Sequence, residues 1–255
     1  MSHVLTGVEE VNLVLCGGGH KGVAHVALLE YLEQQHIKIK AISATSSGAL
    51  VGALYCSGHR PKEILHFFKT TPVFKYTWVN PLKYGLFDTE KYIDILEKMI
   101  PPYFKDLQIP LTVNATNIEE NKVEYFNTGS IIRPMLASCA LPAVFSPVSI
   151  DGKLYSDGGI MDNFAVSPFL EDSTPIIGSY VNTPSLKTPK ELNSILKVTN
   201  HANTLLLEAA NTYKFEKTHH TYQIPVGDYS VFDSKKIDEI YKVATTYFES
   251  FKVVF

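Results

Sequence analysis

The chain has 255 residues, of which 45% are hydrophobic, and its formal net charge is −3. This length and hydrophobic content allow one large core and predict a single domain over residues 1–255. Because the basic residues are scattered and the net charge is negative, the sequence lacks the electrostatic footprint of a nucleic-acid-binding protein.

The sequence shows neither a signal peptide nor a membrane-spanning segment. Residues 1–10 contain two glutamates and no apolar core, and no apolar run approaches the roughly 18 residues of a membrane span. The cysteines Cys16, Cys56 and Cys139 lie far apart without metal-ligand spacing. We therefore expect a cytoplasmic protein with buried reduced thiols and no metal or organic cofactor, and export by a route without a signal stays open.

The first sixty residues predict the opening of an α/β fold. An apolar run at residues 11–16 indicates a buried strand, and the glycine-rich loop 17–22 leads into a helix over 23–35. A second strand over 37–43 is followed by a helix over 49–57. This crossover makes the two strands parallel, so the loops after both strands lie at one edge of the sheet, where such folds bind ligands.

The remaining chain predicts further strands and helices. These are strands over 111–117, 122–127 and 176–181, and helices restarting after Pro61 and over 89–100, 133–139, 190–215 and 235–251. Residues 67–87 are rich in aromatic residues and form either a packed connection or a lid or acyl-chain wall over the site. We expect a motif-bearing core over about 11–182 and a largely helical part over about 183–255.

Ser46 lies between the second predicted strand and its helix, with Ala44 two residues before it and Gly48 two residues after it. A small residue and a glycine in these positions are typical of the sharp turn that exposes a nucleophilic serine. Serine is a weak nucleophile until a base accepts its proton. Asp157, in an acidic turn followed by two glycines, is the candidate base, and burial is expected to raise its pKa toward the working range.

Acyl transfer at a serine also needs donors for the developing oxyanion. The backbone N–H groups of Gly17, Gly18 and Gly19, at the start of a helix, are candidates for this role. Lys21 is a candidate contact for an anion, and a solvated lysine is the alternative.

Together these motifs resemble those of patatin-like phospholipases. The resemblance covers about residues 11–165 and rests on Gly17-Gly18-Gly19-His20-Lys21-Gly22, Thr45-Ser46-Ser47-Gly48, Ser138-Cys139-Ala140-Leu141-Pro142 and Ser156-Asp157-Gly158-Gly159. It implies a three-layer α/β/α fold with a mainly parallel central sheet. It also implies hydrolysis of lipid or other acyl esters by a Ser46–Asp157 dyad with the glycine loop as oxyanion hole. Transient contact with a membrane surface is compatible with this activity, and the oligomeric state stays open.

The glycine loop also fits a different class of protein. Its spacing satisfies G-x-G-x-x-G between a strand and a helix, as in a dinucleotide-binding site. Such a site needs an acidic residue at the end of the second strand, where Ser43, Ala44 and Thr45 stand.

Three further alternatives concern the catalytic group. His201, His219 or His220 could serve as the base of a Ser-His-Asp hydrolase, because all three follow Asp157 in the chain, and His201 could serve a Ser-His acyltransferase. The non-enzyme alternative is a catalytically impaired lipid-binding or scaffolding module. The feature that favours it is Ala44, which stands where the turn usually has glycine.

Overall fold

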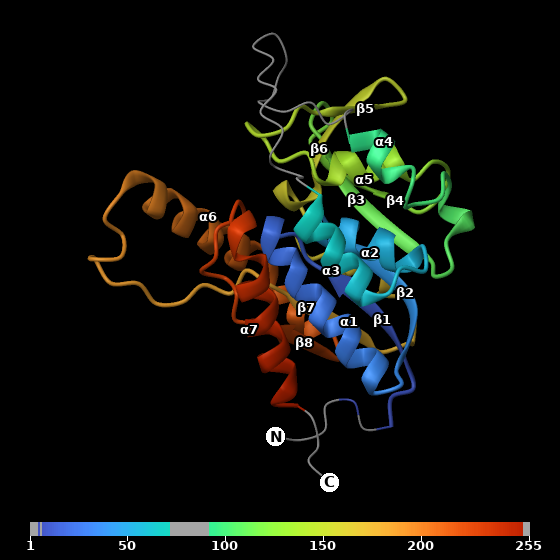
Figure 1. The fold of residues 1–255 in the computed structure, drawn as a ribbon. Coiled ribbons are helices and arrows are strands. Elements are labelled where there is room, and N and C mark those ends of the chain that lie inside the picture. The colour runs from blue at the N-terminus through green and yellow to red at the C-terminus, as the bar shows by residue number, and fades with distance from the viewer. Residues whose placement is uncertain (1–4, 6, 72–91, 252–255) are drawn as a thin grey trace.

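A β-sheet forms the centre of the computed structural model, which describes residues 5, 7–71 and 92–251 (Figure 1). Within these residues the sheet contains β1 (Glu10–Leu15), β2 (Lys38–Ala44), β3 (Leu111–Asn117), β4 (Lys122–Phe126), β5 (Val148–Ile150), β6 (Lys153–Asp157), β7 (Ile176–Tyr180) and β8 (His220–Gln223). The strand order is β5-β6-β3-β2-β1-β7-β8, and β4 pairs with β3.

Five neighbouring strands, β3, β2, β1, β7 and β8, run parallel to one another. β4 and β6 run antiparallel to β3, and β5 runs antiparallel to β6. Nearly every residue of β1, β3 and β7 is buried, as expected when both faces of a parallel sheet are covered. The mainly parallel central sheet predicted from the sequence is confirmed.

The α-helices of the described residues are α1 (Ala24–Gln34), α2 (Ser47–Cys56), α3 (Pro61–Thr70), α4 (Ile93–Leu96), α5 (Ile132–Ser138), α6 (Ile195–Asn211) and α7 (Ile237–Glu249). Shorter 3-10 helices are η1 (Gly19–Val23), η3 (Phe104–Asp106), η4 (Gly158–Ile160), η5 (Ser167–Phe169), η6 (Thr212–Lys217) and η7 (Ser234–Lys236). None of the helices within these ranges combines the length and apolar character needed to cross a bilayer.

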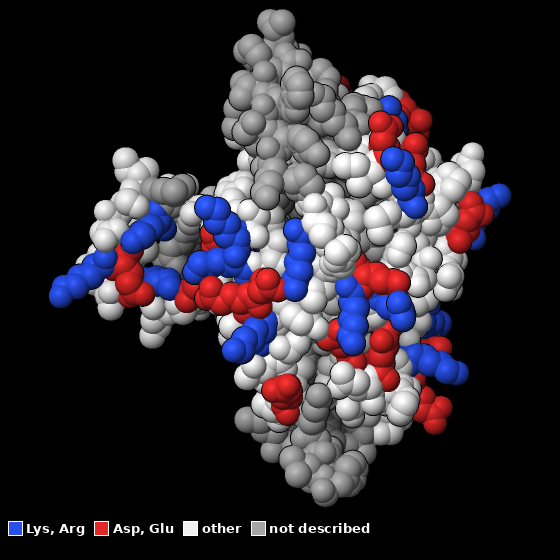
Figure 2. Space-filling model, viewed as in Figure 1, with Lys and Arg blue, Asp and Glu red and all other residues white. Residues whose placement is uncertain are grey.

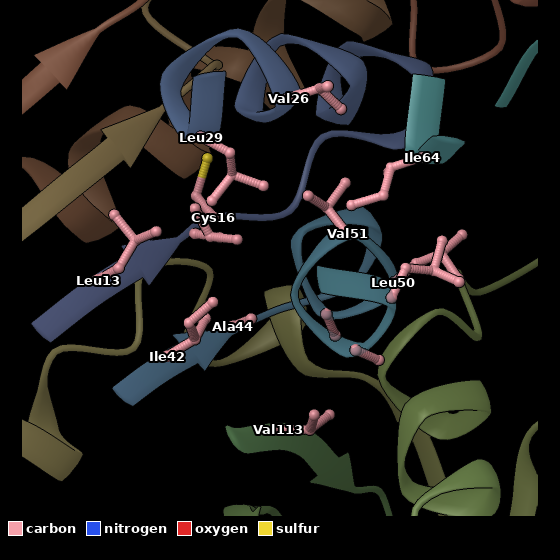
Figure 3. Packing of buried hydrophobic residues seen from close by; sticks show 14 of the residues in the cluster. Leu13, Cys16, Val26, Leu29, Ile42, Ala44, Leu50, Val51, Ile64 and Val113 are labelled. Atoms are coloured by element: carbon pink, nitrogen blue, oxygen red, sulfur yellow. The ribbon is translucent and has the colours of Figure 1, made fainter. Parts of the chain in front are cut away.

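Helices α1, α2 and α3 cover one face of the sheet. Leu13 and Ile42 point from the strands toward these helices and Leu29 points back from α1, whereas Val51 of α2 points toward the other two helices (Figure 3). α7 packs beside α1 although the two helices lie at opposite ends of the chain (Figure 1). A large part of the hydrophobic core therefore lies between the sheet and this helical layer, and the same core continues to Phe164 and Phe169 on the other face.

Short turns, rather than long helices, cover the opposite face. The chain from residue 158 to 172 crosses this face, where the Ser43 hydroxyl donates to the carbonyl oxygen of Ala165 at 2.7 Å. Phe164 from the same segment packs edge-on against Phe215 of η6, with ring centres 5.3 Å apart. The expected α/β/α layering is present, with a third layer built largely of 3-10 turns.

Some predicted boundaries differ from the structure. The helix expected over 23–35 begins as η1, because Gly19 adopts a φ of 59° that starts a tight turn, and it continues as α1. The helix expected over 190–215 is divided into α6 and η6. Of the helix expected over 89–100, the described part contains α4. Most of the aromatic stretch 67–87 lies outside the described residues.

The close approach of α2 to β1 and β2 depends on small residues. A Cβ atom on Gly48 would lie 2.5 Å from the carbonyl oxygen of Leu15 and 2.6 Å from that of Cys16. Ala44, buried at the end of β2, faces Gly52 of α2, where an added Cβ atom would lie 3.5 Å from the Cβ of Ala44 (Figure 3). The methyl group of Ala44 therefore has room, since even a Cβ atom on the facing helix residue would meet it only at an ordinary van der Waals distance.

We expect Gly48→Ala to lower the free energy of unfolding by about 1–3 kcal/mol, because the new methyl group would overlap two backbone oxygens. Gly52→Ala is the matched control in the same helix, since its methyl group would meet side-chain atoms at 3.2–3.5 Å. Its effect should stay within about 1 kcal/mol, because the better helix propensity of alanine offsets the tight contact. Urea unfolding measures both, and equal losses would contradict this packing argument.

Candidate active site

The carboxyl ends of β2 and β6 meet along one edge of β3. β4 occupies the other edge over residues 113–117. On the shared edge Val113 pairs with Ala44, the last residue of β2, and Ala115 pairs with Asp157, the last residue of β6. Since the two pairs lie two residues apart on β3, which is about 7 Å, the turn after β2 and the end of β6 are neighbours in space.

Ser46 forms the turn between β2 and α2 with a strained backbone. Its φ of 53° and ψ of −124° are values that residues other than glycine rarely adopt, at a cost of about 1–3 kcal/mol. Its N–H donates to the Ser138 hydroxyl at 2.7 Å, and its carbonyl oxygen accepts the Cys139 thiol at 3.2 Å. The end of α5 therefore holds the strained turn in place.

The side chains of Ser46 and Asp157 are in direct contact. The Ser46 hydroxyl donates to Oδ2 of Asp157 at 2.7 Å, and Oδ1 accepts the N–H of Gly159 at 2.7 Å. Asp157 is buried, and this burial raises its pKa to about 6, although the hydrogen bonds from Ser46 and Gly159 act to lower it. A carboxylate with this pKa is a good proton acceptor and is still deprotonated at neutral pH.

The glycine loop lies directly against Ser46. A Cβ atom on Gly17 would lie 2.9 Å from the Cβ of Ser46. The N–H of Gly18 already donates to the Ser47 hydroxyl at 3.0 Å. In contrast, the N–H groups of Gly17 and Gly19 donate to no acceptor in the described ranges. Two of the three donors expected from the sequence are therefore open at this loop, and the third is engaged by Ser47.

Two asparagines fix the position of the glycine loop. The side-chain amide of Asn182 donates to the carbonyl oxygen of Gly17 at 2.7 Å, and that of Asn163 donates to the same oxygen at 3.3 Å. Sequence reasoning missed both, because neither lies in a recognisable motif. The one available signal is that Asn182 closely follows β7 at the ligand-binding edge of the sheet.

Lys21 is a buried cation beside the glycine loop. It is only 2% exposed and lines the same cavity as Ser46, so the alternative of a solvated lysine is wrong. Its ammonium group has no hydrogen bond or ion pair to any residue in the described part of the chain. Burial lowers the pKa of Lys21 to about 8, partly opposed by the charge of Asp228, and the group is still mainly protonated at neutral pH.

Ser46, Asp157, Gly17–Gly19 and Lys21 line a cavity of about 780 Å³. Much of its wall is apolar and comes from Leu50, Phe67, Phe68, Ile95, Leu96, Met135, Leu136, Leu141, Val144 and Phe145. Phe67 and Phe68 are the described members of the aromatic stretch predicted from the sequence, and they are both buried and part of this wall. A volume of this size, largely apolar with a few polar groups, is typical of small-molecule sites.

A buried ion pair lies next to the turn at Ser46. Lys214 donates to Oδ1 of Asp162 and the Tyr125 hydroxyl donates to Oδ2, each at 2.6 Å. The carbonyl oxygen of Asp162 accepts the side chains of Thr45 at 3.2 Å and Asn114 at 2.7 Å. The residue before Ser46 is therefore tied to the segment after Asp157 by a second set of contacts.

The histidines considered as alternative bases lie elsewhere. None of His201, His219 and His220 belongs to the described residues that line the cavity. His219 and His220 enter β8 opposite the first residues of β7, which is the edge of the sheet away from Ser46. Over the described ranges, no cluster of three or more histidine, cysteine or acidic side chains could hold a metal ion.

The cysteines are free thiols, as expected from their spacing. Cys16 and Cys56 are buried and Cys139 is partly buried. Burial raises the pKa of all three, to about 12 for Cys16, so that they stay protonated at neutral pH. These properties indicate packing rather than redox chemistry.

Residues 13–170, more than half of the chain, match the family described as patatin-like phospholipase. The chain belongs to the patatin-like phospholipase family. The match includes the glycine loop, Ser46 and Asp157, and it assigns the glycine-rich segment to a patatin-like domain instead of a dinucleotide-binding one.

Curated relatives of this patatin-like chain are longer proteins. It is 31% identical over 162 residues to an uncharacterized NTE family protein of Mycobacterium tuberculosis, and the aligned region covers 62% of this chain and 45% of that protein. It is 27% identical over 292 residues to the lysophospholipase NTE1 of Eremothecium gossypii, and the aligned region covers 98% of this chain and 18% of that protein. The chain thus spans less than half the length of these relatives.

A solved structure supports the fold assignment. VipD from Legionella pneumophila superposes with a TM-score of 0.55 at 16% identity, covering 97% of this chain and 68% of that chain. At this level of identity the similarity shows a shared fold, which agrees with the patatin-like architecture expected from the motifs.

Proposed function

We propose that this patatin-like chain hydrolyses lipid acyl esters with Ser46 as nucleophile and Asp157 as its base. The proposal rests on the 2.7 Å hydrogen bond from the Ser46 hydroxyl to Asp157, at the wall of a largely apolar cavity. The raised pKa of Asp157 supports it, because a base with a pKa near 6 can accept the serine proton and return it during turnover.

The reaction would proceed through an acyl-enzyme. Ser46 Oγ attacks the ester carbonyl carbon as its proton passes to Asp157, and the oxyanion is stabilised by the open N–H groups of Gly17 and Gly19. The carbon–oxygen bond to the alcohol then breaks as Asp157 returns the proton to that oxygen. Water attacks the acyl-Ser46 ester, passes a proton to Asp157 and releases the fatty acid, and Ser46 regains its proton.

Phospholipids and lysophospholipids are the substrate class that fits this cavity. Its apolar wall suits an acyl chain, and the buried ammonium group of Lys21 suits the phosphate of a head group, since it has no protein partner in the described part of the chain. The relative from Eremothecium gossypii is described as a lysophospholipase, which favours the same class.

The alternative of a catalytically impaired lipid-binding or scaffolding module depended on Ala44. The methyl group of Ala44 fits against Gly52, and Ala44 keeps its pairing with Val113 in β3, so this residue gives no reason to expect lost activity. The single-domain organisation, the cytoplasmic location and the transient membrane contact stay predictions from the sequence.

A fluorophosphonate probe should label the protein and fail to label Ser46→Ala, because the probe reacts with an activated serine. Ser57→Ala, at the other end of the same helix, is the matched control and should label normally. Asp157→Asn should reduce ester turnover at least a hundredfold, the usual scale of general-base catalysis, while circular dichroism stays unchanged. Labelling that survives Ser46→Ala would rule out the proposed nucleophile.

Activity should rise with pH to a plateau, with a midpoint near pH 6, because only deprotonated Asp157 accepts the serine proton. The measurement is kcat/KM on a short soluble ester. The pKa of Asp157 is raised in the folded state, so its protonation as the pH falls through 6 stabilises the fold. Unfolding caused by this group therefore does not explain the loss of activity at low pH. A flat profile through this range would argue against Asp157 as the base.

Lys21→Met should lower kcat/KM for a lysophospholipid by about tenfold to a hundredfold, the value of a hydrogen bond to a charged group, because the phosphate loses its cation. Methionine keeps the apolar stem of the side chain in place. A monoacylglycerol of the same chain length is the matched substrate without phosphate, and its rate should change by less than about twofold. Equal losses on both substrates would instead indicate a role for Lys21 at the oxyanion.

A further inference from the structure

Helix α6 carries an apolar stripe on its exposed side. Residues Ile195, Val198, Ala202, Leu205 and Ala209 follow one another at spacings of three and four, which puts them on one side of the helix. Ile195 is 87% exposed, Val198 48% and Leu205 47%, and both alanines are exposed. None of the five is among the described residues that line the cavity. We call these five residues the α6 stripe.

The helix is fixed to the body at one end. At its last residue, buried Asn211 accepts a hydrogen bond from Lys214 at 2.9 Å, and Lys214 also binds Asp162. At the other end, Ile195 and residues 197–200 are exposed. Figure 1 shows the result, in which α6 projects from the body of the molecule. The stripe is therefore presented to the surroundings on a projecting support.

Exposed apolar residues also line the cavity. Four residues line the cavity and are also about half exposed or more: Ile160 at 51%, Met161 at 48%, Leu206 at 68% and Phe232 at 46%. Leu206 lies four residues after the stripe residue Ala202, so α6 contributes to both sets of exposed apolar residues. Exposed apolar residues at a cavity, together with an exposed apolar helix face, are typical of a surface that contacts lipid or another protein.

The charges around α6 do not favour an electrostatic partner. The charged residues of α6 are Lys197 and Glu208, and neither lies on the stripe. In the preceding loop, Lys187 is paired with Asp228 at 2.9 Å. Figure 2 shows basic and acidic side chains mixed over the projecting part of the molecule rather than a field of one sign. Because the described residues of this part show no field of positive charge that would attract an anionic partner, a lipid surface without net charge fits this surface better.

We propose that the α6 stripe and the four rim residues dock on the surface of a zwitterionic lipid aggregate, so that the cavity opens toward the lipid. A partner helix would cover the stripe but would leave the exposed apolar rim unexplained, whereas a lipid surface accounts for both. This inference rests on the proposed hydrolysis of lipid esters. Docking would serve that reaction because an acyl chain could pass from the lipid into the cavity without crossing water.

Vesicle flotation tests the docking independently of turnover. The full chain in its Ser46→Ala form, which spares the lipid, should float with phosphatidylcholine vesicles. Val198→Glu combined with Leu205→Glu should weaken this binding at least tenfold, and glutamate preserves helix propensity. Leu170→Glu is the matched control and should bind like the parent, because Leu170 is 52% exposed but belongs neither to the α6 stripe nor to the described residues that line the cavity. Ile195→Glu alone should weaken binding less, in the same direction.

A short soluble ester separates the two proposals. With Ser46 present, the double variant should hydrolyse it within twofold of the parent rate, which also shows that the variant is folded. Stripe-dependent vesicle binding without any ester hydrolysis would sink the proposed function alone. Docking itself is overturned if the parent does not float, if the double variant floats equally well, or if binding needs anionic lipid and disappears in salt. A dimer that the double variant dissociates would also overturn it, in favour of self-association.

Discussion

The shared edge of β3 is the constraint on which the site depends. Parallel strands deliver all their following loops to one edge of the sheet, so β1 and β2 bring the glycine loop and Ser46 together. An acidic residue that followed another parallel strand would reach Ser46 from a loop. Instead, β6 pairs antiparallel with residues 115–117 on the same edge of β3, next to residues 111–113 that pair with β2, and Asp157 is its last residue. This insertion also buries the carboxylate, so one arrangement of strands determines both its position and its pKa.

The site contains several groups that are unfavourable in isolation. The backbone of Ser46 is strained, and Asp157 and Lys21 are ionisable groups removed from water. Neighbours offset these costs locally: the Ser138 hydroxyl holds the strained turn, and the N–H of Gly159 binds the carboxylate. Lys21 differs from the other two, because none of the described residues binds its ammonium group. An unpaired buried cation lowers stability and leaves its binding capacity for a ligand.

Local patterns in the sequence predicted the local parts of the structure. The first strands, the glycine loop and the turn at Ser46 occur within a residue or two of the predicted positions. The contact between Ser46 and Asp157 spans 111 residues and depends on strand register, which periodicity does not encode. The acidic turn with its two glycines made Asp157 a candidate base, and the family resemblance implied the same pairing. Asn163 and Asn182 act through long-range contacts with a backbone oxygen, for which no residue pattern exists. The segment 158–172 lacks helical periodicity and was therefore not predicted as a layer of the fold.

The hydrogen bonds of the glycine loop fix its conformation before a substrate binds. Gly17 and Gly18 share one peptide group, and consecutive glycines are the residues in which such a plane rotates most easily. Here its carbonyl oxygen is held by Asn163 and Asn182 and its N–H by Ser47, so both ends of the plane are fixed. A flip would break three hydrogen bonds at once. The entropy of this flexible dipeptide is therefore lost when the chain folds and not when a substrate arrives.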